Sequence, residues 1–332
     1  MLDERKASIL RAVVEEYIDT AQPVGSRHVA EDPNIGVSPA TVRSEMAALE
    51  AEGYLIQPHT SAGRIPTDKG YRFFVDSLAE PGPLGATETQ QVREFFARAH
   101  GELEAMLADT SRLLSGITRT AAVVVGPPHE VATVRSVQLV GLAPRVALCV
   151  VVLSNGAIDK HTLELTAETD DEELAAASAH LSEHLVGRSL ASVGPIAPSG
   201  RPEIDRLVDA ASSRLLDERD DPDAVFVGGT SLMASSFDAV DTVRRVLTIL
   251  EQQIVVVTLL RDVLDRGLSV AIGSETGVEP LADCSLVVAP YTVDGEGVGT
   301  IGVLGPTRMN YPQALAAVAV VSQRLGKRLS EG

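Results

Sequence analysis

A run of prolines and glycines, Pro81-Gly82-Pro83-Leu84-Gly85-Ala86, divides this chain of 332 residues into two unequal parts. Proline lacks a backbone hydrogen-bond donor and glycine adds backbone freedom, so neither a helix nor a strand is expected to continue through this run. Residues 1–80 are therefore predicted to fold as a domain of their own. At roughly 150 residues per domain, the chain length predicts two or three domains in all.

The composition is that of a folded protein and excludes several other classes. Hydrophobic residues make up 45% and charged residues 22% of the chain, which is average for globular proteins and excludes wholesale disorder. The apolar runs 121–125 and 146–153 are far shorter than the ~20 residues that cross a bilayer. The first residues lack the apolar core of a signal peptide, so we expect a cytoplasmic protein that does not enter membranes. Cys149 and Cys284 are too few for a disulfide framework or a cysteine-based zinc site, and we expect them in the core.

The net charge of −18 argues against a protein that coats nucleic acid over its whole surface. The net charge is still compatible with a small DNA-binding domain in an otherwise acidic protein. Residues 1–80 contain 8 Lys and Arg against 13 Asp and Glu. Evidence for DNA binding must therefore come from where the cations are placed.

The pattern of residues 1–80 predicts a winged helix-turn-helix domain. Apolar residues recur at helical spacing over residues 4–20, and a short helix is expected from Ser26 to about residue 31. Ser38 and Pro39 are typical of a helix start and Gly53 of a helix end. A short strand over 54–57, a loop over 58–66 and a helix over 67–78 complete the order.

The helix that begins at Ser38 is predicted to enter the major groove, where base edges carry a distinct pattern of donors and acceptors. Its N-terminal residues are the ones that reach bases. We therefore predict that Ser38, Thr41 and Arg43 contact DNA, with Arg43 suited to a guanine edge. The alternative for Arg43 is an ordinary surface charge.

The loop from His59 to Pro66 is predicted to be the wing. It is small, rich in Ser and Gly, and carries a cation that could lie over a phosphate backbone. Phosphate contacts position a domain on DNA without reading sequence. The residues assigned to this role are His59, Arg64, Lys69 and Arg72.

After residue 86 the sequence predicts helices and strands in separate blocks. A helix over 88–118 has apolar residues at coiled-coil spacing, and it either packs on its own domain or forms a dimer seam. Strands are expected first near 134–165 and again after 225, with an acidic helical block over 170–219 between them. This order predicts one α+β domain that contains an insertion.

Two motifs point to chemistry that the surrounding sequence does not support. Residues 297–302 fit the G-x-G-x-x-G pattern, but no helix is expected after them to bind a dinucleotide phosphate, so close packing in a hairpin is favoured. Residues 180–184 fit the H-x-x-E-H pattern of inverted zinc peptidases. No third ligand or cleft can be named there, and a solvated helix face is favoured. We expect no enzyme and no cofactor.

Several segments resemble the heat-inducible transcription repressor HrcA family. The most specific are 57–72 (Gln57-Pro58-His59-Thr60-Ser61-Ala62-Gly63-Arg64 and the eight residues after it) and 299–311. Residues 36–43, 49–55, 271–275 and 284–286 are also similar to the family. The resemblance spans nearly the whole chain and is weakest over 165–225, where His184 stands at a position expected to be Asn.

The resemblance implies a fold and a set of partners. It implies a winged helix over 1–80, a linker and connecting helix over 81–118, and a GAF-like α+β domain over 119–168 and 225–332. Between the two parts of that domain, it implies a largely helical dimerisation domain inserted over 169–224. It also implies a homodimer that binds an inverted-repeat operator in double-stranded DNA, represses chaperone operons and is kept active by the GroEL chaperonin. The alternative is a winged-helix regulator that senses a ligand through its GAF-like domain.

Overall fold

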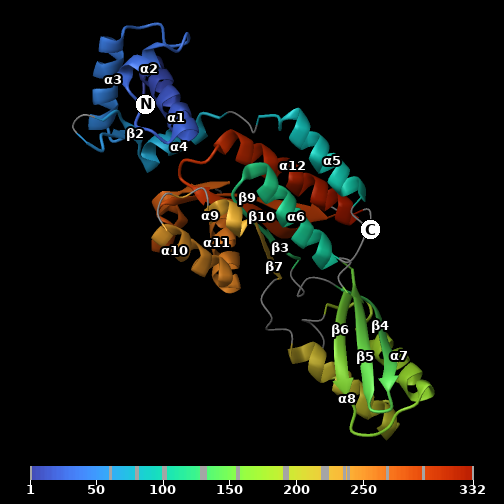
Figure 1. The fold of residues 1–332 in the computed structure, drawn as a ribbon. Helices are drawn as coiled ribbons and strands as arrows, with labels where there is room; N and C mark the ends of the chain where they lie inside the picture. The colour runs from blue at the N-terminus through green and yellow to red at the C-terminus, as the bar shows by residue number, and fades with distance from the viewer. Residues whose placement is uncertain are drawn as a thin grey trace.

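The computed structural model describes residues 2–59, 62–78, 82–98, 103–127, 133–154, 158–189, 194–217, 224–234, 237, 240–266, 269–293 and 296–330. Figure 1 shows three parts in a row, with a small helical domain at one end, a central domain, and an inserted domain at the other end. Of the helices described, none is both long enough and apolar enough to cross a membrane.

The N-terminal domain is the winged helix that the sequence predicts. Its elements are α1 (Glu4–Thr20), α2 (Ser26–Ala30), α3 (Pro39–Ala51), β1 (Leu55–Ile56), β2 (Ile65–Pro66) and α4 (Asp68–Asp76). Ser38 caps α3 by accepting the N–H of Thr41, and Thr67 caps α4 in the same way. Gly53 ends the turn after α3 with φ +80°, a conformation that favours glycine. The core is formed mainly by Ile9, Leu10, Val13, Val42, Met46, Leu49, Leu55 and Phe74.

The central domain is a five-stranded antiparallel sheet in the order β7-β3-β10-β9-β8. Its strands are β3 (Ala121–Val125), β7 (Val225–Gly228), β8 (Val270–Ile272), β9 (Cys284–Val293) and β10 (Glu296–Pro306). Its helices are α5 (Ala86–Arg98), α6 (Leu103–Thr118), α9 (Thr230–Ala234), α10 (Val240–Glu251), α11 (Gln253–Asp265) and α12 (Tyr311–Ser330), with short 3₁₀ turns η3 (Gly273–Thr276) and η4 (Glu279–Leu281).

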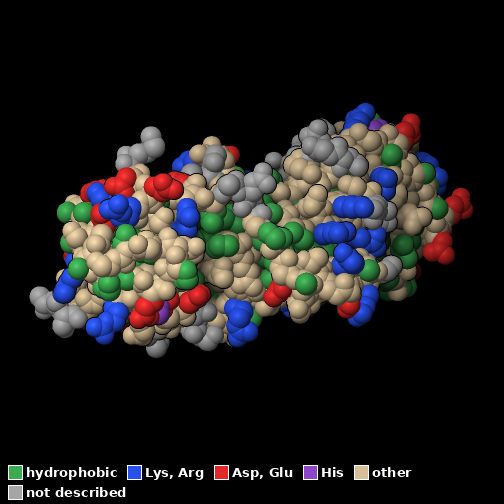
Figure 2. Space-filling model, turned by 90° about the horizontal axis from the view of Figure 1, so that it is seen from above, with side chains coloured by type: hydrophobic (Ala, Val, Ile, Leu, Met, Phe, Trp, Pro, Cys, Tyr) green, Lys and Arg blue, Asp and Glu red, His purple; other side chains and the backbone are tan. Residues whose placement is uncertain are grey.

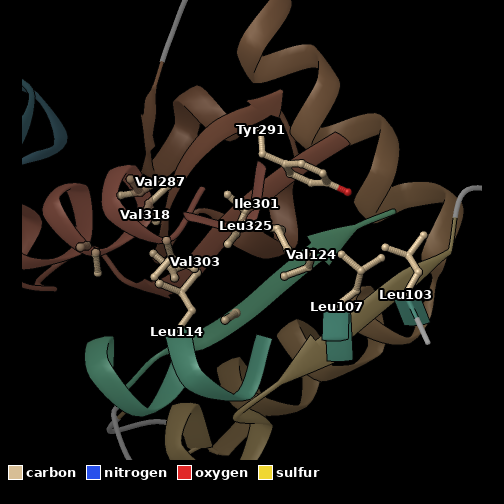
Figure 3. Close-up of a cluster of buried hydrophobic side chains, with 14 of the residues drawn as sticks. Leu103, Leu107, Leu114, Val124, Val287, Tyr291, Ile301, Val303, Val318 and Leu325 are labelled. Atoms are coloured by element: carbon tan, nitrogen blue, oxygen red, sulfur yellow. The ribbon is translucent and has the colours of Figure 1, made fainter. Parts of the chain in front are cut away.

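Both faces of this sheet are covered, which explains why β3 is apolar at every position. Val124 faces the cluster formed with α6 and α12, whereas Val123 and Val125 face the cluster formed with α10 and α11. Figure 3 shows side chains from α6, β3, β9, β10 and α12 meeting in the first of these clusters. A strand buried on both faces requires a continuous apolar run rather than an alternating one.

The apolar stripe predicted along 88–118 is buried inside the chain. Of the predicted positions, Val92, Phe96, Leu103 and Ile117 are each less than a tenth exposed, and Met106 and Leu113 are half-buried. Helices α5 and α6 both pack against α12. The prediction that this helical stretch packs on its own domain is confirmed, and a dimer seam along the stripe is wrong. Residues 99–102 lie outside the described part of the chain.

The inserted domain has its own three-stranded antiparallel sheet, so the boundary between it and the central domain differs from the predicted one. The sheet consists of β4 (Val134–Ala143), β5 (Val146–Leu153) and β6 (Ile158–Glu164), and it packs on α7 (Asp171–Leu185) and α8 (Pro202–Asp217). The family resemblance implies a GAF-like domain that includes residues up to 168. In the part of the chain that the structure describes, these strands form a sheet of their own, and both neighbours of β3 in the central sheet, β7 and β10, come from after residue 224. Over the described residues the insertion therefore begins near 133.

The glycines of 297–302 lie in β10, as the packing interpretation requires. A Cβ at Gly299 would lie 2.3 Å from the hydroxyl oxygen of Tyr291 on β9, so only glycine lets these groups approach. No helix follows directly, since β10 continues to Pro306. Cys149 and Cys284 are both buried, as predicted, and burial raises the pKa of the Cys149 thiol to about 11.

Candidate DNA-binding site

One side of α3 is exposed and carries a single charge. The exposed stripe follows helical spacing and consists of Ala40, Arg43, Ser44, Ala47 and Ala51. On the opposite side, Val42, Met46 and Leu49 are fully buried and fix the rotation of the helix. The guanidinium of Arg43 forms no ion pair or hydrogen bond with any described residue. The stripe therefore contains no acidic group, and the N–H donors of its one guanidinium, that of Arg43, are not used within the described residues.

The acidic residues near α3 are held by cations away from this stripe. Arg5 lies 3.6 Å from Glu45, and Lys6 lies 2.6 Å from Glu52. Figure 2 shows that Lys, Arg, Asp and Glu are mixed over the end of the molecule that holds this domain, at the left of the view. Local pairing of this kind reduces the repulsion that an acidic domain would exert on phosphates.

Ser38 and Thr41 hold the first turn of α3. The Oγ of Ser38 accepts the N–H of Thr41 at 3.2 Å and shares a hydrogen bond with its Oγ1 at 3.0 Å. Replacing such a cap with alanine typically costs about 1 kcal/mol. The structure thus gives both residues a role in shaping the helix start, while their contact with DNA stays a prediction.

Arg64 fastens the wing to α3. Its Nε donates to the Glu50 carboxylate at 3.0 Å, its Nη2 forms an ion pair with the same oxygen at 2.9 Å, and its side chain is only 14% exposed. Its backbone pairs with Val24 in the turn before α2, next to Gly63, where a Cβ would lie 2.3 Å from the Val24 carbonyl oxygen. The charge of Arg64 is therefore already compensated within the domain.

The other predicted phosphate contacts are in different surroundings. His59 is exposed at the start of the wing loop, of which residues 60 and 61 lie outside the described part. Lys69 is exposed, donates to the Glu52 carbonyl at 2.8 Å, and lies 4.2 Å from the ring centre of Tyr54. Of the four residues assigned to phosphate contacts, His59 and Lys69 are exposed, whereas Arg64 and Arg72 are half-buried.

Arg72 faces the central domain. Its Nε donates to Glu275 at 2.9 Å, its Nη2 donates to the Val270 carbonyl at 2.7 Å, and a second contact with Glu275 completes a two-pronged ion pair. These bonds occupy the guanidinium, so the predicted phosphate contact of Arg72 does not fit this arrangement. The reason is that helical spacing cannot show which face of α4 meets a segment 200 residues later.

Two segments that carry the family resemblance, 57–72 and 271–275, meet at this contact. We call it the domain junction and define it by Asp68, Tyr71 and Arg72 of α4 with Ser274 and Glu275 of η3. The Asp68 carboxylate accepts the N–H and the hydroxyl of Ser274, both at 3.2 Å. The ring of Tyr71 packs against that of Tyr311 at the start of α12, 5.8 Å between centres. The junction therefore fixes the N-terminal domain on the central domain.

The charge state of Glu275 sets the pH range of the junction. Burial of the carboxyl opposes its ionisation, but hydrogen bonds from Arg72 and from the Ile272 N–H outweigh burial, and the pKa of Glu275 lies below its ordinary value. A lowered pKa means that the ion pair contributes stability above about pH 5, and that this stability is lost as the pH falls through the folded-state value.

We expect the substitution Glu275→Gln to lower the free energy of unfolding by about 1 kcal/mol at pH 7, because the pair is partly exposed. The difference from the parent protein should shrink toward pH 3, where the parent also loses the charge. Urea unfolding at several pH values measures both effects. The control is Asp76→Asn, which removes the more exposed partner of Arg72 and should change little; equal losses in both variants would contradict the role of Glu275.

Two exposed groups of this domain were missed by the sequence analysis. Ser44 lies beside Arg43 on the exposed stripe, and Arg27 of α2 is exposed and forms no ion pair within the described residues. The signal for Ser44 was available, since it follows Ala40 by four residues and precedes Ala47 by three. Arg27 had no such signal, because a five-residue helix shows no clear periodicity.

Four helices, a two-stranded wing and an exposed stripe of α3 without acidic residues define a winged-helix protein of the DNA-binding class. Residues 104–315 match the family model described as HrcA protein C terminal domain. A heat-inducible transcription repressor HrcA from Nocardia farcinica is 41% identical over 339 residues, covering 99% of this chain and 97% of that protein. Another from Streptomyces avermitilis is 39% identical over 340 residues, with both chains fully covered. The chain therefore belongs to the HrcA family.

A solved structure supports the fold along the whole chain. The crystal structure of a hypothetical protein superposes with a TM-score of 0.74 at 22% identity, covering 100% of this chain and 99% of that one. At this identity the likeness concerns the fold alone.

Proposed function

We propose that this protein represses heat-shock genes by binding an operator upstream of chaperone operons. The observation that carries the proposal is the exposed stripe of α3, whose one unpaired guanidinium can donate two hydrogen bonds to a guanine edge. Its full-length relatives are named heat-inducible transcription repressors, which supports the same function. Ser38, Thr41, Arg43 and Ser44 would face the bases, with His59, Lys69 and Arg27 near phosphates. A cytoplasmic location is part of this proposal.

The active form is proposed to be a homodimer joined through the inserted domains. Along β5 the side chains alternate between buried and half-buried, although nearly every residue of the strand is apolar. Leu148 lies opposite Val140 on β4, on the sheet face away from α7 and α8. This face also exposes Leu142 and Ile158 by 58% and 40%. A strand that is apolar on both faces is typical of one covered on both sides, and a second copy would cover the open face.

A dimer would bind an inverted repeat, because two-fold symmetry in a protein matches two-fold symmetry in its operator. The family resemblance further supports the GroEL chaperonin as the partner that maintains the active form. When unfolded proteins occupy the chaperonin, repression would fall. The ligand-sensing alternative would instead require a small molecule to change operator affinity.

The test is a fluorescence-anisotropy titration of a duplex that carries an inverted repeat from a chaperonin promoter, at one salt concentration near 150 mM. A scrambled duplex of equal length is the control, and each titration is repeated with GroEL. A preference of ~10³-fold or more for the repeat supports the proposal. Equal, weak binding to both duplexes in the presence of GroEL would contradict it.

A further inference from the structure

One face of α7 brings two imidazoles and a carboxylate together. His180, Glu183 and His184 lie three and four residues apart, which places them on one side of the helix. One ligand atom from each lies within 4.8 Å of the others, and the two imidazole rings are 4.5 Å apart between centres. The core uses another face of α7, whose buried side chains are Leu174, Ala177, Leu181 and Leu185.

The hydrogen bonds of the two histidines leave one nitrogen of each ring available. The Nε2 of His180 lies 2.7 Å from the carbonyl oxygen of Ala197, and the Nδ1 of His184 lies 2.9 Å from the carbonyl oxygen of His180. A carbonyl oxygen can only accept, so each of these nitrogens carries the proton. In the neutral rings, the Nδ1 of His180 and the Nε2 of His184 therefore hold lone pairs.

This arrangement is the one that metal-binding histidines show. A histidine ligand donates its second ring N–H to a carboxylate or a backbone carbonyl, which fixes the tautomer and the ring orientation. Both histidines have such a partner, and among the described residues neither they nor Glu183 form an ion pair. Imidazole nitrogen and carboxylate oxygen are ordinary ligands of Zn²⁺ and of neighbouring divalent transition metals.

We propose that His180, Glu183 and His184 form a binding site for a divalent transition-metal ion of the zinc type, with water completing the coordination. The bond from His180 to Ala197 links the site to the segment before α8, in which Ser199 donates to the Asp205 carboxylate at 2.7 Å. A bound ion would fix the His180 ring in the orientation that donates to the Ala197 carbonyl. The site lies in the inserted domain and does not depend on the DNA-binding proposal.

The test is calorimetric titration of the full-length, untagged, chelator-treated protein with ZnCl₂. We expect one ion per chain, and affinity at least tenfold weaker in His184→Asn and in Glu183→Gln. Zn²⁺ should raise the melting temperature of the parent protein but not of these variants, since an ion that binds only the folded state stabilises it. Circular dichroism without metal establishes that both variants are folded.

The matched control is His28→Asn. His28 lies on α2, 3.0 Å from Glu16 and 3.7 Å from Glu31, so it is also an exposed histidine beside carboxylates. This variant should bind Zn²⁺ as the parent does. Absence of binding to the parent, or binding that the His184 and Glu183 variants retain in full, would overturn the proposal.

Discussion

Replacing Arg43 with alanine is expected to cost about 1–3 kcal/mol at each operator half-site and little on random DNA. In a dimer both half-sites lose the contact, so operator affinity should fall roughly 30-fold to 10⁴-fold, at about 1.4 kcal/mol for each factor of ten. The physical reason is that Arg43 carries the only charge on the exposed stripe of α3. It forms no ion pair with a described residue, so no such pair has to break before it contacts a base. Anisotropy titrations of operator and scrambled duplexes measure the two affinities.

Two further variants show whether Arg43 reads a base. Arg43→Lys keeps the charge but loses the planar fork, so it should bind random DNA normally and still lose most of the operator preference. Arg11→Ala removes another exposed arginine of the same domain, on α1, and should leave that preference unchanged. If Arg43→Ala weakens both duplexes equally and lowers the salt dependence by about two counterions per dimer, one for each half-site, Arg43 contacts only the backbone.

The substitution Val150→Lys is expected to separate the proposed dimer into monomers. Val150 lies in the middle of β5 on its half-buried face, between Gln138 of β4 and Lys160 of β6. A lysine at this position would stand beside Lys160, so covering the face with a partner sheet would cost both like-charge repulsion and desolvation. Since two linked reading domains gain about 10²-fold or more over one, operator affinity should fall by at least that factor. Analytical ultracentrifugation measures the change in mass.

The control for this prediction is Ile254→Lys. Ile254 lies on α11 of the central domain and is the most exposed large hydrophobic residue described, at 67%, so it matches the chemistry of the change away from the proposed interface. This variant should keep the mass of the parent protein. A Val150→Lys variant that melts like the parent and remains dimeric would place the interface elsewhere.

The winged helix could be predicted closely because its signals are local. Ser38, Pro39 and Gly53 mark the ends of α3 through backbone chemistry that depends on only a few neighbouring residues. The same reasoning located the block of strands β4, β5 and β6, expected near 134–165 and observed between Val134 and Glu164. It could not assign them to a sheet, because a run such as that of β5 is compatible with either domain until its neighbours are known.

The DNA-contacting residues could be predicted only in part, because some of them depend on contacts between distant segments of the chain. The sequence identified Arg43 from its position in a helix, which is a local property, and the structure leaves it exposed. The roles of Arg64 and Arg72 depend on Glu50 and Glu275, and no rule of spacing connects α4 to a 3₁₀ turn 200 residues later. Long-range ion pairs therefore decided which cations remain available for DNA.

The position of β3 has a consequence for how the chain folds during synthesis. This strand is completed at residue 125, but its hydrogen-bonding neighbours β7 and β10 begin at residues 225 and 296. At about 5–20 residues per second on a ribosome, the apolar edges of β3 wait several seconds for the first neighbour and longer for the second. During this interval the nascent chain exposes an unpaired apolar strand. Folding of this protein during synthesis is therefore expected to depend on chaperones that bind such strands and prevent aggregation.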